Sequence, residues 1–459
     1  MIGFLCILRV AAVLGAERYG VYALILAAVA IAETISSLGF RQIIIREIAR
    51  DSKQTAAIFR MALPPLVVAC FLTGIGLVCY FVFGSSVRDL RMVLLAIILL
   101  ISQSVWALAE PMAFGRQEMH YTAVFGMVGS VVWLVLIYIV PTGSSALEVL
   151  LVAYTLSQLL RAALYIVTEW NRGYFRSREP SRSIPISTRD FLAQSLPLFG
   201  TSLLTIPVTQ LPVLFLGVFS GVVQVGYYSV GNKFVAPISL LASTLVSSVY
   251  PVLAGDFVSD RSRYVSRCLK LFFGMAFIGM FAALTLGLFG RELIQALLGG
   301  GYEGAILPMG VQAWVVLNIG LHSMLGNMFL AANLERLMVK LSVFNAVLIG
   351  GANYLGAHMG ALGLAVSSWI GLLIGFSFHW YFVATRAEVR APTGSLLAAA
   401  SLFAGLSFAS FAVNSEPLGF RLLAYILLSA VIAMALKSCW RIDTSVIMAI
   451  VSRKKALDL

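Results

Sequence analysis

Long apolar stretches separated by short polar gaps run through the whole chain. At about 20 apolar residues per membrane crossing, this pattern predicts fourteen transmembrane helices and an all-α, polytopic membrane protein. The first seven are predicted near Met1–Leu14, Tyr19–Leu38, Ile58–Phe83, Met92–Ala113, Thr122–Val140, Leu147–Trp170 and Phe191–Phe219. The other seven are predicted near Gly226–Val249, Cys268–Phe289, Ile306–Ala332, Val339–Leu355, Ala361–Ala384, Ser395–Val413 and Phe420–Leu436.

The first apolar stretch is shorter than a full crossing. Met1–Leu14 would cover only about 21 Å at 1.5 Å per residue, against roughly 30 Å of hydrocarbon. A cleaved signal peptide is disfavoured, because the stretch has no basic segment before it and no small-residue cleavage site after it. We expect that the missing half of this helix is encoded upstream of the first codon.

Composition and charge support the membrane class and orient the helices. The chain is 60% hydrophobic and 11% charged, whereas soluble proteins have about 25% charged residues. Of its 32 Lys and Arg residues, most lie at alternate gaps, and the intervening gaps hold only Arg18, Arg88, Arg91, Arg291 and Arg421. Because cytoplasmic loops retain basic residues, we expect a cytoplasmic (inner) membrane protein with both termini in the cytoplasm.

The longest polar stretch predicts how the chain divides. Residues 171–190 carry five arginines and two prolines, so we expect a basic cytoplasmic linker there that is attracted to anionic membrane lipids. Residues 1–170 then form one six-helix lobe and 191–384 a second, and 385–459 add two helices and a basic tail. Gly20-Val21-Tyr22 and Gly226-Tyr227-Tyr228 each follow a Leu-Gly pair, at Leu14 and Leu216, which suggests a parallel internal repeat.

Several kinds of chemistry are missing from the sequence. No Lys follows a Gly, which excludes a Walker A loop, and neither Asp-x-Asp nor Gly-x-Ser-x-Gly occurs. The four histidines are too scattered for a zinc helix, and the five cysteines have no metal-binding or disulfide spacing. We therefore expect no metal, no cofactor and no nucleic-acid partner, and transport becomes the leading class. Coupling to a proton or sodium gradient stays open, because no residue supports it.

Ionisable residues inside the predicted spans are candidates for function, because each costs several kcal/mol unless it meets a partner or a wet cavity. Arg161 is the deepest, about 13 Å from the end of its span. Lys233, with the polar Asn232 beside it, and Arg9 lie nearer the external end of their spans, and Glu33 lies near the cytoplasmic end. For each, a structural salt bridge or a side chain that reaches the interface is the alternative. Three cations and one peripheral anion favour an anionic substrate, such as a diphosphate.

Three blocks of the chain carry a family resemblance. The stretch RVAAVLGAERYGVYALILAAVAIAETISSLGFRQIIIREIAR, from Arg9 to Arg50, is similar to the opening of the family of bacterial polysaccharide-biosynthesis flippases. LFLGVFSGVVQVGYYSVGNKF, from Leu214 to Phe234, resembles its seventh-to-eighth helix passage, in which Lys233 stands at an often basic position. LGGGYEGA, from Leu298, resembles the loop before its tenth helix. Pro212 departs from the pattern, because many members carry an acidic residue there.

The resemblance implies a member of the multidrug/oligosaccharidyl-lipid/polysaccharide (MOP) exporter superfamily, with two helix bundles around a cationic cavity. It implies a flippase, not an enzyme, which moves a polyprenyl-diphosphate-linked oligosaccharide by alternating access for O-antigen, capsule or exopolysaccharide. Arg161, Lys233, Arg9, Asn232 and Glu33 are the predicted substrate contacts. Association with a polysaccharide polymerase and glycosyltransferases is also expected. The alternatives are a multidrug exporter of the same architecture and a membrane-embedded glycan polymerase or ligase.

Overall fold

A computed structural model describes residues 2–84, 89–139, 145–173, 187–387, 389, 393–413 and 416–440, and these are helical without strands. Twelve helical segments among them are long and apolar enough to cross a membrane, which confirms an all-α polytopic membrane protein. The predicted fourteen spans differ from these twelve in two places. Helix α1 (Ile2–Ser36) contains the first two predicted spans, and α15 (Thr393–Val413) is not among the twelve.

Contacts divide the chain into two compact units, Met1–Ser229 and Val230–Leu459, and each is described by itself. The first unit contains α1, α2 (Phe40–Arg50), α3 (Thr55–Cys79), α4 (Leu90–Gly115), α5 (Met119–Ile139), α6 (Ala146–Asn171), α7 (Thr188–Leu203), α8 (Ile206–Thr209) and α9 (Leu211–Phe219). Helix α10 (Val222–Ser259) crosses the boundary. The predicted linker 171–190 lies largely outside the described residues and remains a prediction.

Helix α1 is two helical segments that meet at a sharp break. Gly15 adopts φ 70° and ψ 172° inside it, a conformation that glycine reaches at low cost because it lacks a Cβ. The break lies between the predicted spans ending at Leu14 and beginning at Tyr19. The predicted separation of these two spans is therefore confirmed.

The two glycines of the proposed repeat lie at one close helix contact in the first unit. A Cβ on Gly20 would stand 1.8 Å from the carbonyl oxygen of Val222, and a Cβ on Gly226 would stand 2.0 Å from that of Ala16. Each glycine therefore lets the backbones of α1 and α10 touch. The turn before α10 is made by Gly221, with φ 84°, so Gly221 corresponds to Gly15, and the sequence match to Gly217 was wrong by four residues.

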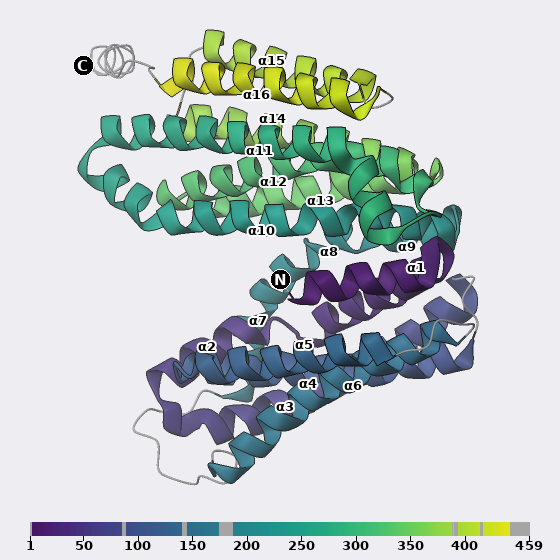
Figure 1. The fold of residues 1–459 in the computed structure, drawn as a ribbon. Coiled ribbons are helices and arrows are strands. Elements are labelled where there is room, and N and C mark those ends of the chain that lie inside the picture. Colours follow the sequence, from purple (N-terminus) through teal and green to yellow (C-terminus); the bar gives the residue numbers. More distant parts are fainter. Residues whose placement is uncertain are drawn as a thin grey trace. The chain divides into compact units, whose positions relative to one another are not determined.

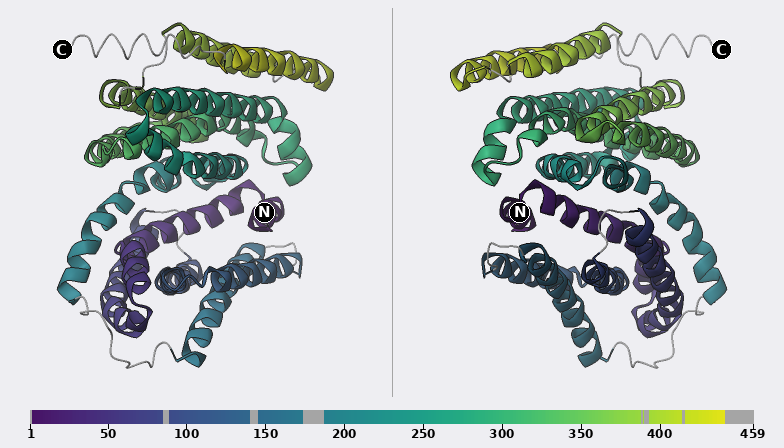
Figure 2. Two further views of the ribbon diagram at one scale, coloured as in Figure 1. Left: turned by 90° about the vertical axis from the view of Figure 1, so that its left-hand side faces the viewer. Right: turned by 90° about the vertical axis from the view of Figure 1, so that its right-hand side faces the viewer.

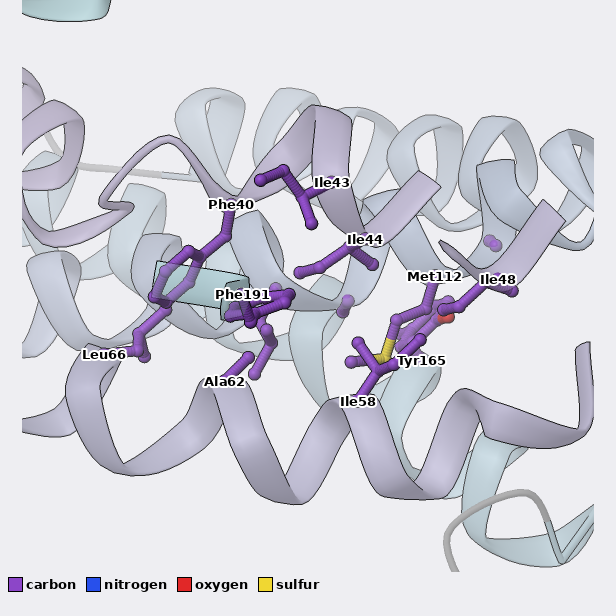
Figure 3. Close-up of a cluster of buried hydrophobic side chains, with 13 residues drawn as sticks. Phe40, Ile43, Ile44, Ile48, Ile58, Ala62, Leu66, Met112, Tyr165 and Phe191 are labelled. Carbon is purple, nitrogen blue, oxygen red and sulfur yellow. The ribbon is translucent and has the colours of Figure 1, made fainter. Parts of the chain in front are cut away.

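Helix α2 is amphipathic, because isoleucines alternate with charged residues along it, and it ends at Arg50. Asp51 is extended there, and its carboxylate accepts a hydrogen bond from the Lys53 amide at 3.0 Å. The apolar face is buried in protein: Phe40, Ile43, Ile44 and Ile48 pack with side chains of α3, α4, α6 and α7 (Figure 3). Phe40 and Phe191 lie 5.0 Å apart between ring centroids. This core fixes α2 to the first unit.

The predicted span Phe191–Phe219 is not one continuous helix. It breaks into α7, α8 and α9, with a proline at the first turn of both α8 and α9. Pro207 and Pro212 have no amide hydrogen and would clash with the preceding turn, so a helix ends before each and a new one begins. One candidate membrane span, Thr188–Thr209, lies in this region, so the predicted crossing is confirmed, but it is not one continuous helix to Phe219.

The second unit contains the rest of α10 and α11 (Arg261–Leu298), α12 (Ile306–Ala331), α13 (Glu335–Ala357), α14 (Gly360–Arg386), α15 and α16 (Leu418–Trp440). Helix α12 packs against α11 and α14, and α13 packs against α14 (Figure 1). Helices α15 and α16 run side by side and contact α11 (Figure 2). Arg421 fastens α16 to α11, since its guanidinium donates to the Leu288 carbonyl at 2.9 Å and pairs with Glu292.

Candidate functional site

Arg161 lies on α6 with its guanidinium stacked on an aromatic ring of α4. Its Cζ is 4.1 Å from the ring centroid of Trp106, close enough for a cation–π interaction of about 0.5–2 kcal/mol. Trp106 is held in turn by Tyr165, whose ring lies edge-on at 6.2 Å. Gly129 of α5 allows this packing, because a Cβ there would lie 3.2 Å from the Ser157 carbonyl oxygen and 3.5 Å from the Arg161 Cβ.

The hydrogen-bonding capacity of Arg161 is unused by the described residues. Its Nε is buried and has no hydrogen-bond partner, and it forms no salt bridge with any residue that the structure describes. A guanidinium carries five N–H donors in a rigid fork that suits carboxylates and phosphates. Leaving a charged donor unmatched inside a span is costly. The arrangement therefore suits an anionic group that is bound and released.

Three further charged side chains of the first unit are linked to Arg161 through Glu110. Arg41 of α2 forms a salt bridge with Glu110 of α4, and these side chains are 45% and 24% exposed. Glu33 of α1 interacts electrostatically with both, and Glu110 interacts with Arg161. We call Glu33, Arg41, Glu110 and Arg161 the four-charge cluster. Its members come from four helices, so the cluster depends on the tertiary fold.

Glu110 is the member that the sequence analysis missed. It lies inside the predicted span Met92–Ala113, so the rule that ionisable residues in spans deserve attention applies to it as well. It lies three residues from the end of that span, where an ionisable side chain can reach the interface. The four-charge cluster therefore holds two carboxylates and two guanidinium groups, and the count of one peripheral anion was too low.

Several aromatic rings pack around Tyr154, a neighbour of Arg161 on α6. Tyr154 lies about two helical turns earlier on α6 and interacts electrostatically with Arg161. Its ring packs edge-on against Trp133 at 4.9 Å and against Tyr22 at 6.4 Å. The Ser36 and Ser104 hydroxyls, 3.0 Å apart, join α1 to α4. Rings and hydroxyls of this kind can contact the apolar faces and the hydroxyl groups of sugars.

The remaining predicted site residues are not members of the four-charge cluster. Arg9 is exposed, and its Cζ lies 5.5 Å from the Tyr138 ring centroid at the end of α5. Lys233 and Asn232 are half-buried on α10 in the second unit. Close by, Gly231 packs against Gln312 and Met309 of α12. Among the described residues, Lys233 has no salt-bridge partner. Of the five predicted residues, Glu33 and Arg161 each interact electrostatically with Glu110.

A second group of charges ties the ends of α4, α5 and α6 together, and we call Arg116, Glu118, Glu169 and Arg172 the clasp. Arg116 Nη2 lies 2.5 Å from Glu169 Oε1, and Arg116 Nε lies 3.0 Å from Glu118 Oε2. Arg172 reaches Glu118 at 3.0 Å. Burial alone would lower the pKa of Arg116, but Tyr165, Glu169 and Glu118 outweigh it and raise this pKa above its usual value. The clasp is a structural device that holds α4 and α6 in register.

Two histidines lie close together in the second unit. The Nδ1 atoms of His322 and His379 lie 3.0 Å and 2.9 Å from the carbonyl oxygens of Asn318 and Gly375, one turn earlier. A carbonyl only accepts, so both Nδ1 atoms donate, as expected of histidines satisfied within a helix. Within the described residues, no group of three or more His, Cys, Asp or Glu side chains could hold a metal.

Comparison with known proteins places this geometry in a family. The family model described as "Polysaccharide biosynthesis protein" matches residues 1–255, more than half of the chain. A search of curated proteins finds no match. A structure titled "Lipid II flippase MurJ, inward closed conformation" is 14% identical, with a TM-score of 0.66 over 95% of this chain and 96% of that one.

A second solved structure has the same fold. It is an inward-facing multidrug resistance MATE family transporter of the MOP superfamily, also 14% identical, with a TM-score of 0.61 over 85% of this chain and 96% of that one. Identities this low show the fold alone. The family match and the two fold matches confirm the resemblance drawn from the sequence: the chain is a multi-pass membrane protein of the polysaccharide biosynthesis protein family, with the fold of MOP-superfamily transporters and flippases.

Proposed function

We propose that this chain moves a polyprenyl-diphosphate-linked oligosaccharide across the cytoplasmic membrane by alternating access, for a surface polysaccharide. The family match and the flippase fold support lipid-linked transport. The observation that carries the proposal is Arg161, a guanidinium inside a span that stacks on Trp106 and has a buried Nε without a partner. A diphosphate presents the charge and the oxygen geometry that such a group binds best.

The neighbours of Arg161 give the proposed site a way to release its substrate. Glu110 already pairs with Arg41 and interacts with Arg161, so a diphosphate must compete with a carboxylate for the guanidinium. Such competition weakens binding enough for the headgroup to leave on the other side. We propose Glu33 as the second carboxylate of this exchange, and Lys233 with Asn232 as a further anion contact in the second unit. Arg9 contributes at the external end.

Charge removal at Arg161 tests the proposal. In a host that lacks its own copy of this gene, Arg161→Ala should lower surface polysaccharide by roughly ten- to a hundred-fold, because a hydrogen bond to a charged group is worth about 1.5–3 kcal/mol. Arg161→Lys keeps the charge but loses the planar fork and should be intermediate. The control is Arg91→Ala, which also removes an arginine from the first unit but at a position whose side chain is 78% exposed.

The location of the lipid-linked oligosaccharide identifies the step that fails. With Arg161→Ala, the intermediate should accumulate where an impermeant periodate reagent cannot oxidise it in intact cells. Single repeat units exported to the outside would instead indicate a polymerase. Normal surface polysaccharide from Arg161→Ala, at membrane levels equal to the unmodified protein, would reject the proposed role.

Drug export is a second candidate, and one observation favours it. Glu33 and Glu110 are two carboxylates near each other in the first unit, and carboxylates are what a cation exporter needs. The fold matches a multidrug transporter at a TM-score of 0.61. If this chain exports drugs, deleting it should sensitise cells to cationic drugs while surface polysaccharide stays normal. The polysaccharide flippase predicts the opposite pair of results.

A further inference from the structure

The turn after α2 and the end of α4 enclose a polar pocket that lies outside the four-charge cluster. Its volume is about 530 Å³, and it is lined by residues 48–53 and 115–117. This volume falls in the usual range of small-ligand sites, roughly 300–1,000 Å³. Three of the lining side chains are basic, Arg50, Lys53 and Arg116, and one is acidic, Asp51. The pocket therefore favours an anion.

The floor of the pocket is rigid. Ile48 lines the pocket and also belongs to the buried core under α2 (Figure 3). Gly115 lets α4 come against α2 at this point, because a Cβ there would lie 2.7 Å from the Ile48 Cβ and 3.1 Å from the Ile45 carbonyl oxygen. The clasp fixes Arg116, whose side chain is only 3% exposed. A ligand would meet a preformed surface on this side.

The rim of the pocket is accessible and basic. The side chain of Arg50 is 64% exposed, and its pairing with Glu47 at 3.0 Å leaves most of the guanidinium in solvent. Lys53 is exposed, with its amide held by Asp51 in a tight turn. The pocket lies at the end of the span Leu90–Gly115, which is the depth of lipid headgroups. Basic side chains at that depth attract anionic lipid phosphates.

We propose that this pocket, formed by the α2 turn and the α4 terminus, binds a phosphate group. Arg50 and Lys53 contact the phosphate oxygens. The guanidinium of Arg116, at the floor of the pocket, adds to the positive electrostatic potential. The phosphate belongs to an anionic lipid headgroup or to a free phosphate ion, and both present the same oxygens to the same cations. The site does not depend on the proposed transport function, because none of these residues belongs to the four-charge cluster.

A bound phosphate would hold the first unit at the membrane surface. Helix α2 packs on α3, α4, α6 and α7 through its apolar face. A headgroup bound at the end of α2 is therefore connected, through this core, to four other helices. We infer that the pocket anchors this end of the unit to the leaflet that carries the anionic lipid. Occupancy should therefore raise the thermal stability of the protein.

The experiment uses the full chain in nanodiscs of phosphatidylcholine, with phosphatidylglycerol added as the probe. Retained phosphatidylglycerol is counted by native mass spectrometry after release from the disc. The test variant is Arg50→Gln/Lys53→Gln, and the control is Arg261→Gln/Arg263→Gln. The control removes two basic residues from the second unit, of which Arg263 is 62% exposed, similar to Arg50. All three proteins are compared at equal thermal stability in phosphatidylcholine alone.

Specific binding predicts a loss that only the pocket variant shows. Each removed charge should lower phosphatidylglycerol affinity about five-fold, and the pair about 25-fold, whereas the control should change it less than two-fold. A second arm adds millimolar inorganic phosphate. If phosphate displaces phosphatidylglycerol or stabilises the protein alone, the pocket accepts the free ion; if neither occurs while the lipid still binds, the ligand is the headgroup. Equal losses in both double variants, or none in the pocket variant, would overturn the proposal.

Discussion

The clasp gives the sharpest prediction about stability, because it contains a buried ion pair in the first unit. Arg116 and Glu169 have side chains only 3% and 2% exposed, with Nη2 and Oε1 2.5 Å apart. Removing one partner leaves the other charge buried without compensation. Glu169→Gln leaves Arg116 with Glu118 and Tyr165, at 3.0 Å and 3.3 Å. Arg116→Met leaves Glu169 without its hydrogen-bonded partner and with only the electrostatic attraction of Arg172, so it should be the more damaging change.

The magnitude follows from the burial. Breaking a buried pair by removing one partner costs about 3–5 kcal/mol. Each kcal/mol lowers the melting temperature by about 2–4 °C for a unit of 150–250 residues. Arg116→Met should therefore lower the apparent melting temperature by roughly 6–20 °C. Replacing both partners by methionine removes both charges, so the double variant should lose less than the sum of the single variants.

The assay is the apparent melting temperature of the purified protein in detergent, for both single variants and the double variant. Unfolding is followed by the fluorescence of a thiol-reactive dye.

The dependence of the melting temperature on pH can also be predicted. The pKa of Arg116 is raised, so its contribution is fully present below the unfolded pKa of an arginine, which lies far on the alkaline side, and is lost only as the pH rises through the still higher folded pKa. The stabilisation should therefore not fall on the alkaline side of neutrality.

Two results would refute this reasoning. If each single variant melts within about 2 °C of the unmodified protein, less than about 1 kcal/mol is involved, and the pair acts as a surface pair. If the double variant loses the full sum, Arg116 and Glu169 act independently and the clasp does not couple α4 to α6. Arg263→Met is the matched control, because it removes an arginine that is 62% exposed.

Two other predictions concern packing and orientation. Gly20→Ala and Gly226→Ala should each destabilise the protein by about 1–3 kcal/mol through overpacking. The control Gly74→Ala, whose Cβ would meet nothing within 4 Å, should be neutral or stabilising. The three variants are compared by thermal melting, and equal melting temperatures would contradict the close contact between α1 and α10. In a cysteine-free background, Glu303→Cys should react with an impermeant maleimide in intact cells, whereas Arg189→Cys should react only after permeabilisation. If Arg189→Cys reacts in intact cells and Glu303→Cys does not, the predicted topology is wrong.

The fold followed from the sequence to a large extent, because the length and apolarity of each crossing are local properties. The break near Gly15 and the amphipathic α2 were both visible as patterns in the chain. The breaks within the span Phe191–Phe219 are also encoded locally, in Pro207 and Pro212. A count of apolar residues misses them, because it takes no account of the effect of proline on helix geometry. The partner of the α2 apolar face could not be predicted, because its pattern suits a lipid surface as well as the protein core that buries Phe40.

The candidate site was predicted in part, and the limit is physical. Arg161 and Glu33 were identified because they are ionisable groups in apolar segments, which is a property of the sequence. Their proximity depends on how α1, α4 and α6 pack, and no spacing in the chain encodes it. Trp106 gave no signal at all, since an aromatic residue in a span is ordinary. Its importance comes only from lying 4.1 Å from the Arg161 guanidinium.

The presence of Glu110 changes what the charges of the first unit mean. Three cations and one peripheral anion would make a permanently positive site, which would bind a diphosphate tightly and release it slowly. The four-charge cluster instead has two guanidinium groups and two carboxylates, with Arg41 already paired to Glu110. A site that is nearly neutral when empty favours an anion by only a small margin, because the incoming charge must displace an existing partner. For a flippase, which must release on one side what it binds on the other, such a margin serves transport better than high affinity. Glu110→Gln should accordingly bind a diphosphate headgroup more tightly and move it more slowly.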